Sequence, residues 1–131
     1  MYNINKMSIF KNLKTTCYIA SKLGSTEDEE GNEITQYDTP KKYVFNIQPV
    51  VNNSVEGADI QAFGELAQRM KVAVITERDK YKDKFKEFDL AYLDGATPEN
   101  ELYNGQNANY MVHLVAVQNT IIRVFFTKIV K

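Results

Sequence analysis

The chain has 131 residues, the length of one ordinary domain, and its 44% apolar share is typical of a globular protein. Its formal net charge of −1 argues against a protein that holds nucleic acid mainly by charge, because such domains are strongly basic. One cysteine excludes an internal disulfide, and one histidine leaves no multi-histidine metal site. No apolar run is long enough for a membrane helix or a signal peptide, so we expect a soluble domain with no membrane partner.

The first expected strand is Leu13 to Ala20, and residues 1–12 before it are expected to form a flexible N-terminal arm. Alternation places one set of its side chains on the same face, namely Leu13, Thr15, Cys17 and Ile19. No activating cation lies next to Cys17 in the sequence, so we interpret this residue as a small buried hydrophobe.

The segment from Gly24 to Glu33 is polar and acidic, and its charge predicts a protruding hairpin loop that does not pack. Four consecutive acids lie in it: Glu27, Asp28, Glu29 and Glu30. A solvated loop tip is one interpretation, and calcium binding is a weaker one, because the alternating oxygen ligands of an EF-hand are missing. A third interpretation is an acidic protrusion that inserts between partner subunits or repels DNA.

A second strand is expected from Lys41 to Asn52, where Tyr43, Phe45 and Ile47 alternate with polar and smaller residues. Pro49 cannot donate a ladder hydrogen bond, so it is expected at a bulge or on an edge, where a neighbouring copy could add a strand.

The clearest helical pattern runs from Asp59 to Met70, with Asp59 as the N-cap and Gly64 limiting its length. Its apolar stripe consists of Ile60, Phe63, Ala67 and Met70. The stripe is expected to cap one open end of a barrel, while Phe63 and Leu66 are candidates for contact with a neighbouring copy. A strand is expected to follow, from Lys71 to Thr76.

The segment from Glu77 to Glu87 fits both a helical and a strand spacing, and we expect an irregular or single-turn connector before a short strand, Asp89 to Leu93. Its basic and aromatic residues could form a weak surface for single-stranded nucleic acid, but Asp79 and Asp83 dilute the charge, so a solvated face is the favoured interpretation. The loop from Asp94 to Asn109 is long for a compact domain, which makes it a functional candidate.

The C-terminal segment from Tyr110 to Val130 predicts a central hairpin that is covered on both faces, with Asn119 in a left-handed turn. In its first strand, one face is expected to carry Met111, His113, Val115 and Val117. A lone histidine in such an apolar strand is interpreted as a core or barrel-lining residue, not as a catalytic base.

Together these elements predict a mainly β fold: residues 1–131 form a single domain, a small antiparallel β-barrel of five to six strands with one short inserted helix. The chain carries no G-x-S-x-G elbow, P-loop or G-x-G-x-x-G motif, and no pair of carboxylates is distinguished. We therefore expect no catalytic residue, no metal and no cofactor. A small carboxylate enzyme is the weakest alternative.

Three phrases of the sequence carry a resemblance: DIQAFGE (Asp59 to Glu65), FDLAYLDG (Phe88 to Gly95) and PENELYNGQNANY (Pro98 to Tyr110), followed by the terminal hairpin. With this layout the chain resembles the small head–tail connector proteins of long-tailed bacteriophages and prophages, in particular the head-closure or stopper type. None of the three phrases is a mechanistic motif.

The resemblance implies a virion structural protein, located in the neck of the virion and in the host cytoplasm during assembly. Its copies would form a ring beneath the portal and adaptor, hold the packaged double-stranded DNA with their loops, and receive the tail proteins. The candidate loops are Gly24 to Asp38 and Asn52 to Ala58, and their candidate channel or partner residues are Glu27, Asp28, Glu29, Glu30, Asn52, Asn53 and Glu56. An acidic tip suits a gate that must not bind DNA tightly.

Two alternatives stay open at this point. A tail terminator or tail-completion protein shares the same resemblance. A single-stranded nucleic-acid-binding barrel of the OB type would use Tyr81, Lys84 and Phe85 as its stacking surface.

Overall fold

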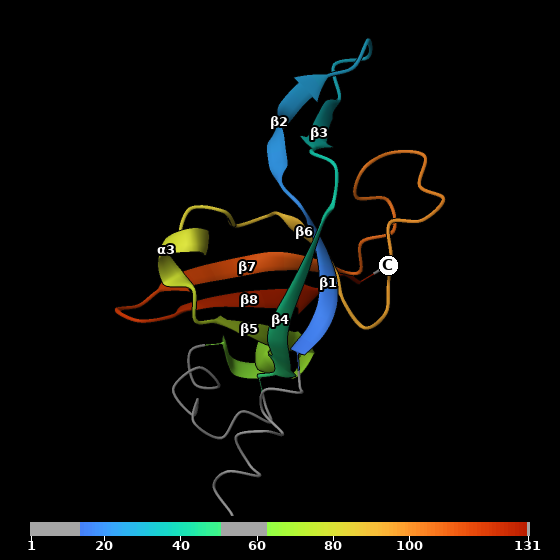
Figure 1. Cartoon of the computed structure of the whole chain (residues 1–131). Coiled ribbons are helices and arrows are strands. Elements are labelled where there is room, and N and C mark those ends of the chain that lie inside the picture. The colour runs from blue at the N-terminus through green and yellow to red at the C-terminus, as the bar shows by residue number, and fades with distance from the viewer. Residues whose placement is uncertain (1–13, 51–62, 131) are drawn as a thin grey trace, which may run out of the picture.

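The computed structural model describes residues 14–50 and 63–130, and its centre is a closed antiparallel barrel of six strands (Figure 1). The strands follow one another around the barrel in the order β1-β4-β5-β8-β7-β6. Their bounds are β1 Lys14–Ala20, β4 Lys41–Pro49, β5 Met70–Ile75, β6 Leu90–Tyr92, β7 Tyr110–Val117 and β8 Ile122–Lys128. The prediction of a mainly β fold with a five- to six-stranded barrel and one short helical insertion is thus confirmed. The expected arm, residues 1–12, lies outside the described residues.

Two more strands, β2 (Lys22–Glu27) and β3 (Glu33–Tyr37), form a separate two-stranded sheet that projects away from the barrel (Figure 1). The expected loop from Gly24 to Glu33 is therefore a β-hairpin, and only its tip is a turn. β-branched residues explain the difference, because Thr26 pairs with Ile34 across the hairpin and such residues favour strands even among charges.

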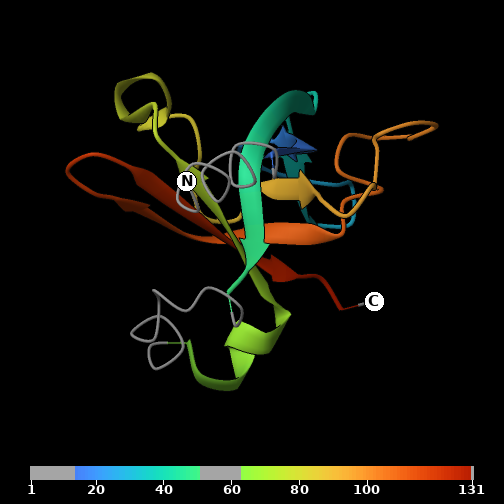
Figure 2. The same ribbon diagram turned by 60° about the horizontal axis from the view of Figure 1, so that its bottom comes forward.

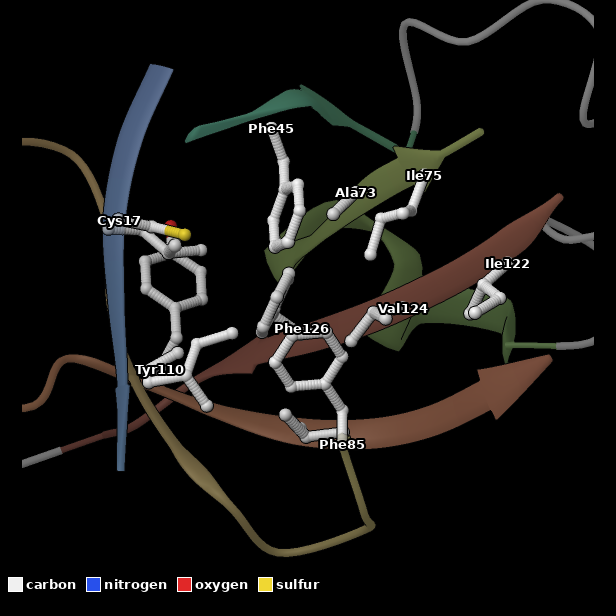
Figure 3. Close-up of a cluster of buried hydrophobic side chains, with 13 residues drawn as sticks. Cys17, Phe45, Ala73, Ile75, Phe85, Tyr110, Ile122, Val124 and Phe126 are labelled. Atoms are coloured by element: carbon white, nitrogen blue, oxygen red, sulfur yellow. The ribbon is translucent and has the colours of Figure 1, made fainter. Parts of the chain in front are cut away.

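The barrel interior is filled by one face of each strand, as Figure 3 shows. The buried interior residues are Cys17, Ile19, Phe45, Ala73, Ile75, Phe85, Ala91, Leu93, Tyr110, Val112, Ile122, Val124 and Phe126. Cys17 is fully buried, as expected, and the alternation expected for β4 is confirmed, because Tyr43 and Ile47 pack against the same cluster as Phe45. Interdigitation of large aromatic and small side chains gives the barrel a packed core and no channel.

The alternation expected for β7 is wrong after its third residue. A register shift between Val112 and Leu114 marks a bulge. Before the bulge the even-numbered residues of β7 point into the barrel, and after it an odd-numbered residue does. As a result Val112 and Val115 both contact the interior cluster, whereas Met111 and Val117 do not belong to it.

The expectation for the turn of the C-terminal hairpin is wrong. Asn119 is not left-handed: within the described residues, the non-glycine residues with positive φ are Phe88, Asp94 and Asn100. The β7–β8 turn is closed by a 2.9 Å hydrogen bond from the Gln118 N–H to the Ile121 carbonyl oxygen.

One end of the barrel is closed by the connector that follows β5. This connector contains the single-turn helix α3 (Arg78–Tyr81), which confirms the expected short element. The Tyr81 and Phe85 rings meet the rings of Tyr43 and Phe45 with centroid separations of 5.2–6.1 Å. Because Phe85 is buried and Tyr81 is half-buried in this aromatic cluster, they are not available as the stacking surface of the OB-type alternative.

The expected helix from Asp59 to Met70 is a 3-10 helix, η2 (Gly64–Arg69), within the described residues, and Asp59 and Ile60 lie outside them. Gly64 at its start has φ 59°, a conformation that an α-helix does not contain. Met70, the last residue of the predicted apolar stripe, already belongs to β5, so the observed helix is shorter than the predicted one.

The position expected for η2 is also wrong, because it does not cap an open end of the barrel. Figure 2 shows η2 outside the strands. Ala67 of η2 packs against Met70, Val72 and Phe125. The residues that follow the last two in the sequence, Ala73 and Phe126, belong to the interior cluster, so Val72 and Phe125 lie on the outer face of the barrel. η2 therefore covers the outer face of β5 and β8. This cover explains why both faces of β8 are buried. The expectation that the hairpin is covered on both faces is wrong for the second half of β7, where Leu114 is 44% and Val117 45% exposed.

Pro49 has a different role from the one expected. It is the last residue of β4 and is paired in register with Lys71 of β5, inside the closed barrel. The barrel therefore offers no free edge at this proline, and the only separate sheet among the described residues is the β2–β3 hairpin.

Candidate functional site: a groove between the acidic hairpin and the long loop

The base of the β2–β3 hairpin is fixed by the buried carboxylate of Asp89. Its Oδ1 accepts a hydrogen bond from the Lys22 N–H at 2.8 Å, and its Oδ2 accepts one from the Lys86 N–H at 2.9 Å. Burial raises the pKa of Asp89, although the two N–H groups oppose the shift. The start of the hairpin is thereby tied to the connector that closes the barrel.

The tip of the hairpin is organised by Asp28. Its Oδ1 accepts hydrogen bonds from the Glu30 N–H at 2.9 Å and the Asn32 N–H at 2.8 Å, which is the pattern of an Asx turn. The Asn32 N–H is the main reason why the pKa of Asp28 is lowered. Of the four acids predicted as a channel or partner site, Asp28 therefore builds the turn, while Glu27, Glu29 and Glu30 are exposed.

The long loop between β6 and β7 is ordered by its own polar side chains. Oε2 of Glu101 accepts hydrogen bonds from the Tyr92 hydroxyl at 2.5 Å and from the Asn107 N–H at 2.7 Å. The Tyr92 hydroxyl accepts in turn from the Gly105 N–H at 2.9 Å. The loop is thus held against the outer face of β6, where a small apolar cluster contains Ala20, Tyr92 and Ala108.

A second residue, Asn109, holds the end of this loop. Its side-chain amide donates to the Leu93 carbonyl oxygen at 2.8 Å, and its Oδ1 accepts from the Leu93 N–H at 2.9 Å. The loop also contacts the hairpin, because Nδ2 of Asn104 donates to the Tyr37 carbonyl oxygen at 3.2 Å. Loop and hairpin therefore have a defined relative position.

Between the hairpin and the loop lies an open groove of about 850 Å³. It is lined by Leu23, Glu33, Ile34, Thr35, Gln36, Tyr37, Leu102, Tyr103 and Asn104. The most exposed large apolar side chains of the described residues include four that line this groove: Leu102 is 88% exposed, Tyr103 66%, Leu23 64% and Ile34 46%. Exposed apolar side chains that gather in this way are typical of a binding surface.

The remaining candidate residues have separate positions. Asn52, Asn53 and Glu56 lie outside the described residues. The Phe63 ring packs against the rings of His113 and Phe125, with centroid separations of 5.6 and 5.1 Å, so it is partly used within the subunit.

Leu66, the second candidate for a subunit contact, is 36% exposed and remains accessible. His113 contacts the outer cluster through Phe63, so it does not line the barrel interior.

Sequence reasoning singled out the long loop but missed the residues that matter in it. Leu102 and Tyr103 are two large apolar residues in an otherwise polar loop, and that local contrast was the available signal. No local signal marks Asp89, because its partners lie 67 and 3 residues away along the chain.

A polar cluster lies on the far side of the barrel from the connector, where Lys71 and Asp94 form an ion pair and the Tyr110 hydroxyl donates to Asp94 Oδ2 at 3.0 Å. Burial raises the pKa of Tyr110 to about 12, and the Asp94 charge adds to the shift. Burial also opposes ionisation of Asp94, but its bonds to Lys71 and Tyr110 outweigh this effect and lower its pKa. The cluster links β5, β7 and the end of β6, which is a structural role.

Within residues 14–50 and 63–130, no group of three or more histidine, cysteine or acidic side chains could hold a metal ion. None of the helices in the same ranges is long and apolar enough to cross a membrane. Comparison of the chain with family models, curated proteins and solved structures gives no significant match.

Proposed function

We propose that the protein is a head-closure component of a long-tailed bacteriophage or prophage, a structural protein that joins the DNA-filled head to the tail. The observation that supports this most is the acidic hairpin, which stands off a closed barrel on a base fixed by Asp89. A barrel of this kind works as a rigid support, and the hairpin and loop are its contact surfaces. In this proposal no bond is made or broken by the protein.

The charge of the hairpin tip suits a position next to packaged DNA. Glu27, Glu29 and Glu30 are exposed, while Asp28 is engaged in the turn. Like charges repel more strongly in a narrow channel with low-dielectric walls than in bulk water, so the tip would block the channel without binding the phosphate backbone tightly. Several copies in a ring would bring several such tips together.

Binding to the portal–adaptor complex encoded by the same genome tests the proposal directly. We expect the purified chain to bind this complex and filled heads closed with it to retain their DNA. Binding only to the end of the tail tube would instead identify a tail terminator or tail-completion protein. Binding to neither assembly would refute a role in joining head and tail.

A charge variant tests the role of the hairpin tip. The triple substitution Glu27→Gln, Glu29→Gln and Glu30→Gln removes three exposed charges and leaves the Asp28 turn intact. We expect portal binding to persist and the release of DNA from closed heads to change. The matched control neutralises three exposed acids elsewhere, Glu65, Glu87 and Glu99, and should leave both properties unchanged. An unchanged release of DNA in the triple variant would assign the gate to another segment.

A further inference from the structure

The groove beside β3 has the form of a site for an added strand. Among the described residues β3 pairs with no strand besides β2, so its other edge is open to a further strand except at Tyr37, whose carbonyl oxygen accepts from Asn104. Five consecutive residues, 33–37, line the groove, which shows that it follows the length of this strand. Leu102 and Tyr103 form the opposite wall. An extended segment of five residues would pair with the open edge and lie against the apolar wall made by Leu102 and Tyr103.

The chain itself contains a segment with matching chemistry before β1. In Tyr2-Asn3-Ile4-Asn5-Lys6, two apolar residues and a lysine occupy every second position, so all three share one face of a strand. Residues 1–13 contain two lysines and no acid, whereas Glu33 and the exposed acids of the hairpin tip lie at one end of the groove. We infer that residues 2–6 of one copy add to β3 of a neighbouring copy as an antiparallel strand.

Charge fixes the direction and register of the added strand. If Lys6 lies opposite Glu33, antiparallel pairing puts Ile4 opposite Thr35 and Tyr2 opposite Tyr37. Tyr2 then lies at the end of the groove where Asn104 contacts the hairpin, close to the apolar wall of the loop. The reverse direction would place Lys6 at the apolar end and leave the acids without a partner.

Reach favours the groove of another copy. Lys14 begins β1, and the hairpin starts beyond the opposite end of that strand and extends away from the barrel (Figure 1). The stretch from Lys6 to Lys14 spans at most about 29 Å, and only when it is fully extended. To reach its own Glu33, the segment would have to run back along the whole of β1 and beyond it, whereas the groove of a neighbouring copy sets no such demand.

The inference deepens the proposed function, and it rests on the self-association that a connector ring requires. Each copy has one such segment and one groove, so the contact is head-to-tail and closes into a ring when the rotation between copies permits. One contact of five residues is small, and ring closure would multiply its effect.

Disulfide trapping between full-length copies tests the inference. Lys6→Cys copies are mixed with Glu33→Cys copies of different mass and treated with a mild oxidant, and Cys17 does not compete because it is fully buried. We expect a cross-linked heterodimer. The control mixture replaces Glu33→Cys by Glu65→Cys, an exposed acid outside the groove, and should give at least 10-fold less product.

A second pair of variants separates docking from random collision. Tyr2→Asp with Ile4→Asp alters the segment, and Leu102→Asp with Tyr103→Asp alters the exposed groove wall, so neither pair disturbs the core. Loss of two apolar contacts is expected to weaken association about 100-fold in each variant, at about 10-fold per contact. In a mixture of the two variants, the intact segment of one can occupy the intact groove of the other, but the remaining segment and groove of that pair are both altered. Sedimentation of the mixture should therefore show dimers and nothing larger.

Three results would overturn the inference: equal cross-linking in the control mixture, a double Lys6→Cys/Glu33→Cys chain that closes an internal disulfide, or variants that associate like the wild type. Portal binding is read separately. If trapping fails while portal binding holds, only the arm exchange is wrong; if trapping succeeds while portal binding fails, the chain self-associates and the connector role is wrong.

Discussion

Asp89 provides the sharpest test of how the hairpin is held. The substitution Asp89→Asn keeps the shape of the side chain and replaces one carboxylate oxygen by an amide group, which donates and does not accept. Either the Lys22 N–H or the Lys86 N–H then loses its acceptor in a buried position. The connection between the hairpin and the barrel is weakened without opening a cavity.

The size of the effect follows from two opposing terms. A hydrogen bond to a charged group contributes about 1.5–3 kcal/mol, and the variant loses one of them. Part of this loss is offset, because the variant no longer buries a charge, and the raised pKa of Asp89 shows that burial of this charge is costly. We expect a net loss of about 1–2 kcal/mol in the free energy of unfolding, or about 4–8 °C in Tm for a chain of this length.

The pH dependence has a definite sign. Because the folded-state pKa of Asp89 is raised, the folded protein binds a proton at a pH where the unfolded chain has released it. The wild type is thus stabilised by this group as the pH falls through the raised pKa toward about 3.9, the ordinary value for aspartate. Asn does not titrate, so the deficit of the Asp89→Asn variant grows on acidification.

Chemical unfolding at pH 7 and pH 5 measures both effects, with Asp83→Asn as the control because Asp83 is exposed on the same connector. Hydrogen exchange at the amides of Lys22 and Lys86 reports the local change. The reasoning is refuted if Asp89→Asn is as stable as Asp83→Asn, or if its deficit shrinks at the lower pH.

Two further predictions concern the long loop and the barrel interior. Gly105 and Gly95 have φ of 91° and 84°, so Gly105→Ala and Gly95→Ala should each lose about 1–2 kcal/mol in chemical unfolding. Gly105→Ala should lose more stability than Gly95→Ala, because a Cβ at position 105 would lie 2.7 Å from Leu90 Cδ1, whereas a Cβ at position 95 meets no atom within 4 Å. Equal losses of stability in the two variants would contradict this reasoning. Burial raises the pKa of Cys17 to about 12, so a thiol reagent at pH 8 should modify it only on unfolding, and rapid labelling of the folded protein would show that the barrel opens.

The barrel was predictable because its signals are local. Alternation in β4 and the apolar runs of β7 and β8 depend on neighbouring residues, and the core that they form follows directly. The alternation failed where one extra residue enters β7 near Val112, because a bulge depends on the partner strand. The prediction of the helix failed for a similar reason. Its apolar stripe matches helical spacing, but Met70 pairs with Thr127 as part of β5, and the segment between Gly64 and Met70 forms a short 3-10 helix.

The candidate site was harder to predict, because it is made by contacts between distant segments. The acids of the hairpin were found by their composition, yet the role of Asp28 in the turn depends on the geometry of backbone N–H groups. The groove needs the loop to lie beside the hairpin, and the Asn104–Tyr37 bond that joins them spans 67 residues. A single sequence holds no measure of such proximity.

The proposed contact role needs surfaces that keep their position without help from a partner, and in this chain a few residues hold them. Asp89 sets the base of the hairpin, Glu101 and Asn109 hold the loop, and Asn104 joins the two. Each is a polar side chain bonded to backbone groups, so the positions are set by hydrogen-bond geometry and not by apolar packing alone. Leu102 and Tyr103 are left exposed by the same bonds. Because the groove is already formed, the proposed strand addition would cost little free energy in reorganisation of the groove, and the main cost would be ordering of the added segment.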